Sequence, residues 1–172
     1  DFGAATPVTL ILDKNSVWGG AGTWNLSQLN YATRSLTLTA FANTINFSGH
    51  NTPITGSTGT ILSSAATVWN FTGGTSQTLP AAANVQYGSI RVSNSTTVTL
   101  GIGLNAANLL AGIDVQTGTL SNGGFAIVGT AGNTFNVANG ATFLLTGTST
   151  MVTGFGTRTF GSTLPNCSTV NY

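Results

Sequence analysis

The chain has 172 residues, of which only 4% are charged, and its formal net charge at pH 7 is +1. Four basic residues give no positive surface for nucleic acid, and no cationic amphipathic stretch is present for a membrane surface. With three acidic residues and one histidine, the chain has too few side chains for most acid–base catalysis or metal binding. We therefore expect a chain that is not an enzyme, holds no metal or cofactor and has no nucleic-acid partner.

The remaining composition favours one folded domain over residues 1–172. Apolar residues make up 41% of the chain and lie in short runs, far below the roughly 20 residues that a membrane-spanning helix needs. Cys167 is alone, so no internal disulfide forms, and its role is open. Low charge, scarce cysteine and abundant threonine, asparagine and glycine are typical of a secreted or surface protein of a microbe, so we expect an extracellular location.

Secondary structure is expected to be almost entirely β. Threonine favours strands, while glycine and asparagine interrupt every short window with turn signals. Beyond strands we expect at most a short helical turn near Ala106–Leu110.

A triplet of a large apolar, a polar and a large apolar residue recurs along the chain, at spacings of 21, 24, 21, 23 and 22 residues. Residues i and i+2 of a strand share one face, so each triplet buries its outer two side chains and exposes the middle one. The instances are Trp24-Asn25-Leu26, Ile45-Asn46-Phe47, Trp69-Asn70-Phe71, Ile90-Arg91-Val92, Ile113-Asp114-Val115 and Phe135-Asn136-Val137.

A second apolar column recurs between the triplets. It comprises Leu36, Leu38, Ile61, Leu79, Val98, Leu100, Leu120, Phe143, Leu145 and Leu164. Two or three short strands in a period near 22 predict a parallel β-solenoid of about seven coils, a rod on the order of 35 Å long. The alternative is a β-sandwich, which also has short strands and regular turns. A sandwich gives no reason for one triplet to recur at near-equal intervals, so the solenoid is favoured.

The middle residues of the triplets should form one outer surface column in the solenoid. This candidate surface column is Asn25, Asn46, Asn70, Arg91, Asp114 and Asn136. Stacked asparagines form amide ladders, and Arg91 and Asp114 would lie on adjacent coils and pair.

Beyond Val137 the repeat becomes less regular. Thr157-Arg158-Thr159 falls 22 residues after Phe135 but lacks the apolar pair, and Val170-Asn171-Tyr172 reads as a further triplet. We therefore expect one longer coil or a loop around Gly154-Phe155-Gly156.

Residues 66–172 resemble the repeat regions of large secreted surface proteins of Bacteroidetes and related environmental bacteria. The phrases that carry the resemblance are Ala66-Thr67-Val68-Trp69-Asn70-Phe71-Thr72-Gly73, Ser76-Gln77-Thr78-Leu79, Tyr87-Gly88-Ser89-Ile90-Arg91-Val92, Thr97-Val98-Thr99-Leu100, Val137-Ala138-Asn139-Gly140-Ala141-Thr142-Phe143 and Gly154-Phe155-Gly156-Thr157-Arg158-Thr159-Phe160. Residues 168–172 look like the opening of a further unit, equivalent to the phrase at Thr67. The resemblance implies a scaffold or adhesin repeat cut from a longer array, and it carries no catalytic residues.

The candidate acid–base groups are few and dispersed. Asp13 and Asp114 lie four to five coils apart in this register, so they cannot act on one sugar bond as paired carboxylates do. His50, within Ser48-Gly49-His50-Asn51, is interpreted as a turn residue. No calcium-binding repeat or phosphate loop is present.

Threonine pairs give a more specific hypothesis. Thr37/Thr39, Thr58/Thr60, Thr97/Thr99 and Thr117/Thr119 recur with Ser76/Thr78 between them, and they are the candidate Thr face. A regular outward array of hydroxyl and methyl groups would order water and bind ice, although threonine is also simply a common exposed strand residue.

Three functions therefore remain open. The favoured one is a non-enzymatic extracellular rod that serves as a stalk, adhesin repeat or filament subunit, with possible glycans or cell surfaces as partners. Residues 1–12 would then cap the first coil or add to a neighbouring subunit, and open coil ends would favour end-to-end self-association. Ice binding is the second function. A polysaccharide-binding or -cleaving β-helix is the third, with Trp18 and Tyr31 as exposed aromatic candidates.

Overall fold

The computed structural model describes residues 8–38, 42–147, 152–162 and 168–171. These residues form strands and turns, with no helix among them. The strands are β1 (Val8–Ile11), β2 (Ser16–Trp18), β3 (Gly22–Ala32), β4 (Leu36–Leu38), β5 (Asn43–Ser48), β6 (Ile54–Gly56), β7 (Ile61–Leu62), β8 (Val68–Gly73), β9 (Gln77–Thr78), β10 (Tyr87–Thr99), β11 (Leu109–Ser121), β12 (Thr134–Val137), β13 (Thr142–Leu144), β14 (Thr157–Phe160) and β15 (Thr169–Asn171).

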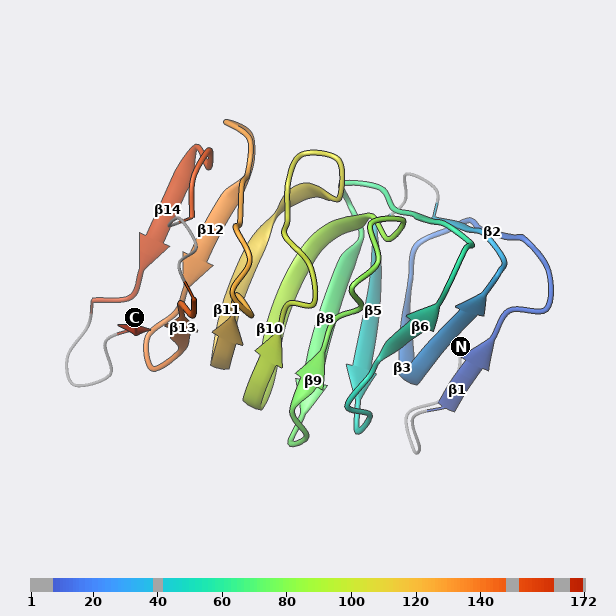
Figure 1. The fold of residues 1–172 in the computed structure, drawn as a ribbon, viewed down its shortest axis with the longest axis horizontal. Helices are drawn as coiled ribbons and strands as arrows, with labels where there is room; N and C mark the ends of the chain where they lie inside the picture. Colours follow the sequence, from blue (N-terminus) through green and yellow to red (C-terminus); the bar gives the residue numbers. More distant parts are fainter. Residues whose placement is uncertain (1–7, 39–41, 148–151, 163–167, 172) are drawn as a thin grey trace.

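The chain winds into a parallel β-solenoid. Its strands form a twelve-stranded and a three-stranded sheet, and the pairings within both sheets are parallel. Figure 1 shows the coils side by side along the long axis, with β1 and β14 at opposite ends of the stack. Parallel pairing of about seven turns with a period near 22 residues confirms the predicted solenoid, and the β-sandwich alternative is wrong.

Each coil has three faces. The first face carries β5, β8, β12, β14 and the first halves of β3, β10 and β11, which pair in sequence order. The second face carries β6, β9, β13, β15 and the second halves of β3, β10 and β11. The third face begins with β2, β4 and β7 and continues as isolated bridges such as Leu104–Ile127. The long strands β10 and β11 therefore bend around the corner between the first two faces.

The register of the first face agrees with the predicted triplets. Ile45 lies opposite Trp24 on one side and Trp69 on the other, and the same alignment continues through Ile90 to Phe135. The outer two residues of each triplet are buried, except that Trp24 is half-buried in the first complete coil. The repeated triplet thus forms two continuous apolar columns inside the stack.

The second apolar column of the sequence analysis divides between two faces. Leu36 and Ile61 pair on the third face, whereas Val98 and Leu120 pair on the second. Leu164 lies outside the described residues. The interpretation as a single column was wrong. Each coil has three faces, and residues that recur at similar spacings in the sequence lie on different ones.

Two expectations beyond Val137 are also wrong. Arg158 lies opposite Phe135, so the equivalent triplet is Arg158-Thr159-Phe160, one residue later than expected. Val170 pairs with Phe143 on the second face, so residues 168–171 are not equivalent to the phrase at Thr67, which precedes a strand of the first face. Tyr172 lies outside the described residues.

The short helical turn expected near Ala106–Leu110 is present as a single hydrogen-bonded turn that leads directly into a strand. The backbone N–H groups of Asn108 and Leu109 both donate to the Asn105 carbonyl, at 3.1 and 2.9 Å, and β11 begins at Leu109. The strand pairing of Leu109 with Tyr87 ends the turn before a helix can develop.

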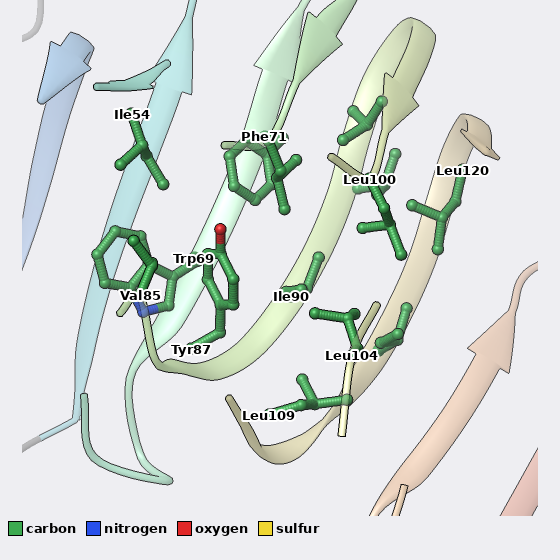
Figure 2. Packing of buried hydrophobic residues seen from close by; sticks show 14 of the residues in the cluster. Ile54, Trp69, Phe71, Val85, Tyr87, Ile90, Leu100, Leu104, Leu109 and Leu120 are labelled. Atoms are coloured by element: carbon green, nitrogen blue, oxygen red, sulfur yellow. The ribbon is translucent and has the colours of Figure 1, made fainter. Parts of the chain in front are cut away.

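Aromatic side chains fill the centre of the stack. Trp69 is fully buried, lies 5.9 Å from the Phe47 ring and meets Tyr87 edge-on at 5.6 Å. Figure 2 shows Trp69, Phe71 and Tyr87 with aliphatic side chains of the following coils. At the other end, Phe135 contacts three further phenylalanine rings. These rings contribute large buried areas and hold adjacent coils at one spacing.

Buried asparagines satisfy backbone groups at the corners. Asn94 donates to the Thr75 carbonyl of the preceding coil at 2.9 Å, and Asn133 donates to the Leu110 carbonyl at 2.9 Å. Both side chains are at most 2% exposed. Buried backbone polar groups without partners are costly, so these amides replace the strand ladder where the chain turns. The asparagines of this kind are Asn94, Asn108, Asn122 and Asn133.

Tyr87 provides a test of this packing. Its hydroxyl is buried with no hydrogen-bond partner among the described residues, and burial raises the pKa of Tyr87. A buried unsatisfied group costs about 1–3 kcal/mol, so Tyr87→Phe should raise the free energy of unfolding by about 1 kcal/mol. Urea denaturation measures this change.

Tyr31→Phe is the matched control. Tyr31 is equally buried, but its hydroxyl donates to Asn84 Oδ1 at 3.3 Å, so its removal should give no gain in stability. If Tyr87→Phe gives no more stability than Tyr31→Phe, the assignment of an unsatisfied hydroxyl at Tyr87 is contradicted.

Candidate functional site

The candidate surface column lies on the outside of the first face. Strand pairing places each of its members opposite the next. The side chains are half-buried, because each lies between those of the neighbouring coils. In chain order the column is Asn25, Asn46, Asn70, Arg91, Asp114 and Asn136, and Thr159 extends it on β14.

Three asparagines at the start of the column form an amide ladder. Asn46 Nδ2 donates to Asn25 Oδ1 at 2.8 Å, and Asn70 Nδ2 donates to Asn46 Oδ1 at 2.8 Å. Both bonds run in the same direction, so Asn46 and Asn70 each donate to the preceding coil. The ladder follows from identical residues at identical positions of successive coils.

The ladder is followed by a charged pair. Arg91 Nε lies 3.3 Å from Asp114 Oδ2, which also accepts a hydrogen bond from Gln116 at 3.0 Å. The other carboxylate oxygen accepts a hydrogen bond from Asn136 Nδ2 at 2.8 Å. The Arg91 and Asp114 side chains are 36% and 30% exposed. The predicted pairing is confirmed, and at this exposure it contributes about 0–1 kcal/mol.

A shallow groove of about 520 Å³ lies over this part of the first face. Its lining comes from four neighbouring strands of the sheet, β10, β11, β12 and β14, and from Gly132 just before β12. Gly132 leaves open space on this surface, and hydroxyl, amide and charged side chains surround it. The lining residues are Ser89, Arg91, Ala111, Gly112, Ile113, Asp114, Gly132, Thr134, Phe135, Asn136, Thr157 and Thr159.

The candidate Thr face does not form one surface. Thr37 lies on the third face in β4, and Thr58 and Thr60 lie in the connection that precedes β7. Thr97 and Thr99 lie on the second face in β10, and Thr39 is outside the described residues. The expected single column of threonine pairs is therefore wrong.

Gly118 explains why Thr117 and Thr119 do not lie on one face. It has a φ of 68°, a backbone conformation that favours glycine, and it turns the chain at the corner between two faces. Thr117 therefore lies opposite Ser93, whereas Thr119 lies opposite Thr97. The two threonines belong to different faces.

The second face nevertheless carries a continuous file of threonines. Thr97 pairs with Thr119, Thr119 with Thr142, and Thr142 with Thr169. We call these four residues the Thr file. The sequence analysis missed Thr142 and Thr169, whose only signal was their position directly before the apolar residues Phe143 and Val170.

The remaining candidates are dispersed. The His50 ring accepts a hydrogen bond at Nδ1 from the Thr52 backbone N–H at 3.1 Å, as suits the turn residue that was predicted. Asp13 is exposed in the turn between β1 and β2, several coils from Asp114. Among the described residues, no group of three or more histidine, cysteine, aspartate or glutamate side chains could hold a metal ion. Cys167 lies outside those residues.

Tyr31 and Trp18, the two aromatic candidates for sugar binding, differ in burial. Tyr31 is fully buried, so it was wrongly placed on the surface, and burial raises the pKa of its phenol. Trp18 is half-buried and packs against Trp24 with ring centroids 5.0 Å apart. A second hollow, of about 500 Å³, opens beside these two tryptophans in the first coil.

Comparison of the chain with protein-family models, with curated proteins and with solved structures found no match. In the described part of the chain, no helix is long and apolar enough to cross a membrane.

The amide ladder gives a prediction of its own. Asn46→Ala removes a donor and an acceptor from the ladder and should lower the free energy of unfolding by about 1–2 kcal/mol. Asn25→Ala removes one acceptor only, and should cost about half as much. Urea denaturation of both variants measures the difference, and equal costs would contradict a ladder in which each inner amide makes two bonds.

Proposed function

We propose that this chain is a non-enzymatic structural and adhesive module of a secreted or cell-surface protein. In this role it is a rigid β rod that serves as a stalk, an adhesin repeat or a filament subunit. The observation that carries the proposal is the unbroken parallel pairing of the first face from β3 to β14. Backbone hydrogen bonds between successive coils run along the axis, and stacked apolar columns lie behind them.

The outer surface supports the same role. Its polar groups are mostly hydroxyls and amides, which suit many weak contacts with glycans or with other cells. The resemblance of residues 66–172 to bacterial surface repeats agrees with an extracellular location. Parallel edges at the first and last coils favour end-to-end stacking of further coils, whether from another copy or from more chain.

The rod is tested with two copies of the chain fused directly in tandem. Small-angle X-ray scattering should give a cross-sectional radius equal to that of one copy, and a maximum dimension longer by about seven coil spacings, roughly 34 Å. A fusion through a 20-residue Gly/Ser linker is the control, with a broad distance distribution. A cross-section that grows in the direct fusion, or a distribution as broad as the control, would overturn the rod.

Ice binding is a second candidate function, and the Thr file is the observation that favours it. Its four threonines lie in register on adjacent coils, and Thr78 and Thr99 pair beside them. If this face orders water, the purified chain inhibits ice recrystallisation and Thr119→Tyr abolishes the inhibition. Thr37→Tyr on the third face is the control and should keep it. Inhibition that is absent, or unchanged in Thr119→Tyr, would exclude the Thr file as an ice-binding surface.

A further inference from the structure

We propose that the groove over β10, β11, β12 and β14 binds a neutral, hydroxyl-rich polysaccharide that lies along the axis of the solenoid. The proposal rests on the adhesive role above and names the chemical class of its ligand. The groove extends over four adjacent strands, which is three coil spacings or about 14 Å. That length accommodates a few sugar units of an extended chain.

The groove has hydrogen-bonding groups that are held in place and not fully used. A guanidinium has five N–H donors, and Arg91 uses one of them among the described residues, toward Asp114. A carboxylate has about four acceptor sites, and Asp114 uses three, toward Arg91, Gln116 and Asn136. Asn136 donates one hydrogen bond, and its carbonyl oxygen accepts none from the described residues. These mutual contacts hold the side chains in position before a ligand arrives, which lowers the entropic cost of binding.

Hydroxyl groups extend the same surface along the axis. Thr134 and Thr157 are exposed, pair directly with each other and make no side-chain hydrogen bond to the described residues. A hydroxyl donates and accepts, so it suits the hydroxyls of a sugar. Beside Thr134, Gly132 is exposed and has open space where a side chain would stand, and this lets a flat ring approach the surface there.

The charge of the groove argues against ionic ligands. Among the described residues that line it, only Arg91 and Asp114 are formally charged, and they pair with each other. An anionic chain would meet the carboxylate, and a cationic one would meet the guanidinium. A neutral ligand uses both as hydrogen-bonding groups without breaking the pair.

The backbone argues against a peptide. An extended peptide binds a sheet by adding to a free strand edge. β10, β11 and β12 each pair on both sides, so these three strands offer no edge. Among the described residues β14 pairs with β12 alone, so its free edge faces the end of the stack and not the face that carries the groove. Recognition here uses side chains alone, which favours a ligand rich in hydroxyls.

The test is co-sedimentation of the purified chain with insoluble neutral polysaccharides (cellulose, chitin and β-1,3-glucan), with cross-linked polygalacturonate as the acidic comparison. The chain should bind at least one neutral polysaccharide and not the acidic one. Thr134→Trp fills the groove from an exposed position and should weaken binding by about tenfold or more. Thr157→Trp fills the same groove from the next coil and serves if the first variant does not fold.

Two controls separate the groove from the rest of the surface. Thr23→Trp changes an exposed residue of the same file on β3, since Thr23 aligns through Thr44, Val68, Ser89 and Gly112 with Thr134, and it should bind as the unmodified chain does. Trp18→Ala removes an aromatic ring from the hollow of the first coil and should also leave binding unchanged.

Several outcomes would overturn the proposal. The first is that the chain binds no neutral polysaccharide, and the second is that it binds polygalacturonate in preference. The third is that folded groove variants bind as well as the unmodified chain does. The fourth is that Trp18→Ala alone loses binding. Each of these would leave the rod intact if the tandem fusion still scatters as one extended particle. If the tandem fusion does not scatter as an extended rod but the groove variants lose binding, the rod is rejected and the binding groove is retained.

Discussion

The backbone hydrogen bonds between successive coils are the constraint on which the rest of this structure depends. They form only when each coil has nearly the same shape as the one before it, because parallel strands must remain in register over three faces. This requirement explains why pairs of apolar residues recur on the first face at 21 to 24 residue intervals. It also explains the aromatic centre, since Phe47, Trp69 and Tyr87 fill the space that the corners enclose.

The same constraint determines how the outer surface is built. Each exposed position has a neighbour at one coil spacing on both sides, so a row of like charges would repel along the whole axis. The first face avoids this with asparagines that bond to one another, and it has one basic residue directly opposite one acidic residue. The polar surface is thereby held in a fixed arrangement, which is also the property that makes the groove suitable for recognition.

The sequence predicted the parts of the fold that depend on strand periodicity. The triplets were identified correctly because residues i and i+2 of a strand share a face and the triplet recurs at one spacing. Corners were harder to predict, because glycine, asparagine and serine occur throughout the chain and so do not distinguish a corner from a strand. Gly118 is an example: nothing local separates it from Gly88, yet only Gly118 of the two has a positive φ and divides two threonines between faces.

The groove could not be predicted for a related reason. It arises where Gly132 lies beside larger polar residues from neighbouring coils, and that combination is visible only once the register is known. Arg91 and Asp114 were identified because charged residues are so rare here. The exposed hydroxyls of Thr134 and Thr157 had no such signal among the many threonines of the chain.

The corner asparagines have a consequence for how such a chain can change over generations. Asn94 bonds to the carbonyl of Thr75 in the coil before it, and Asn122 accepts a hydrogen bond from the Thr146 backbone N–H in the coil after it. A duplicated or deleted stretch of the gene therefore retains these bonds only if its length is a whole coil and its new neighbour turns at the same place. Lengthening by entire coils is thus tolerated more readily than insertion of a few residues at a corner. At each new junction, the buried amides stabilise the chain only if the neighbouring coil places its backbone groups within hydrogen-bond distance.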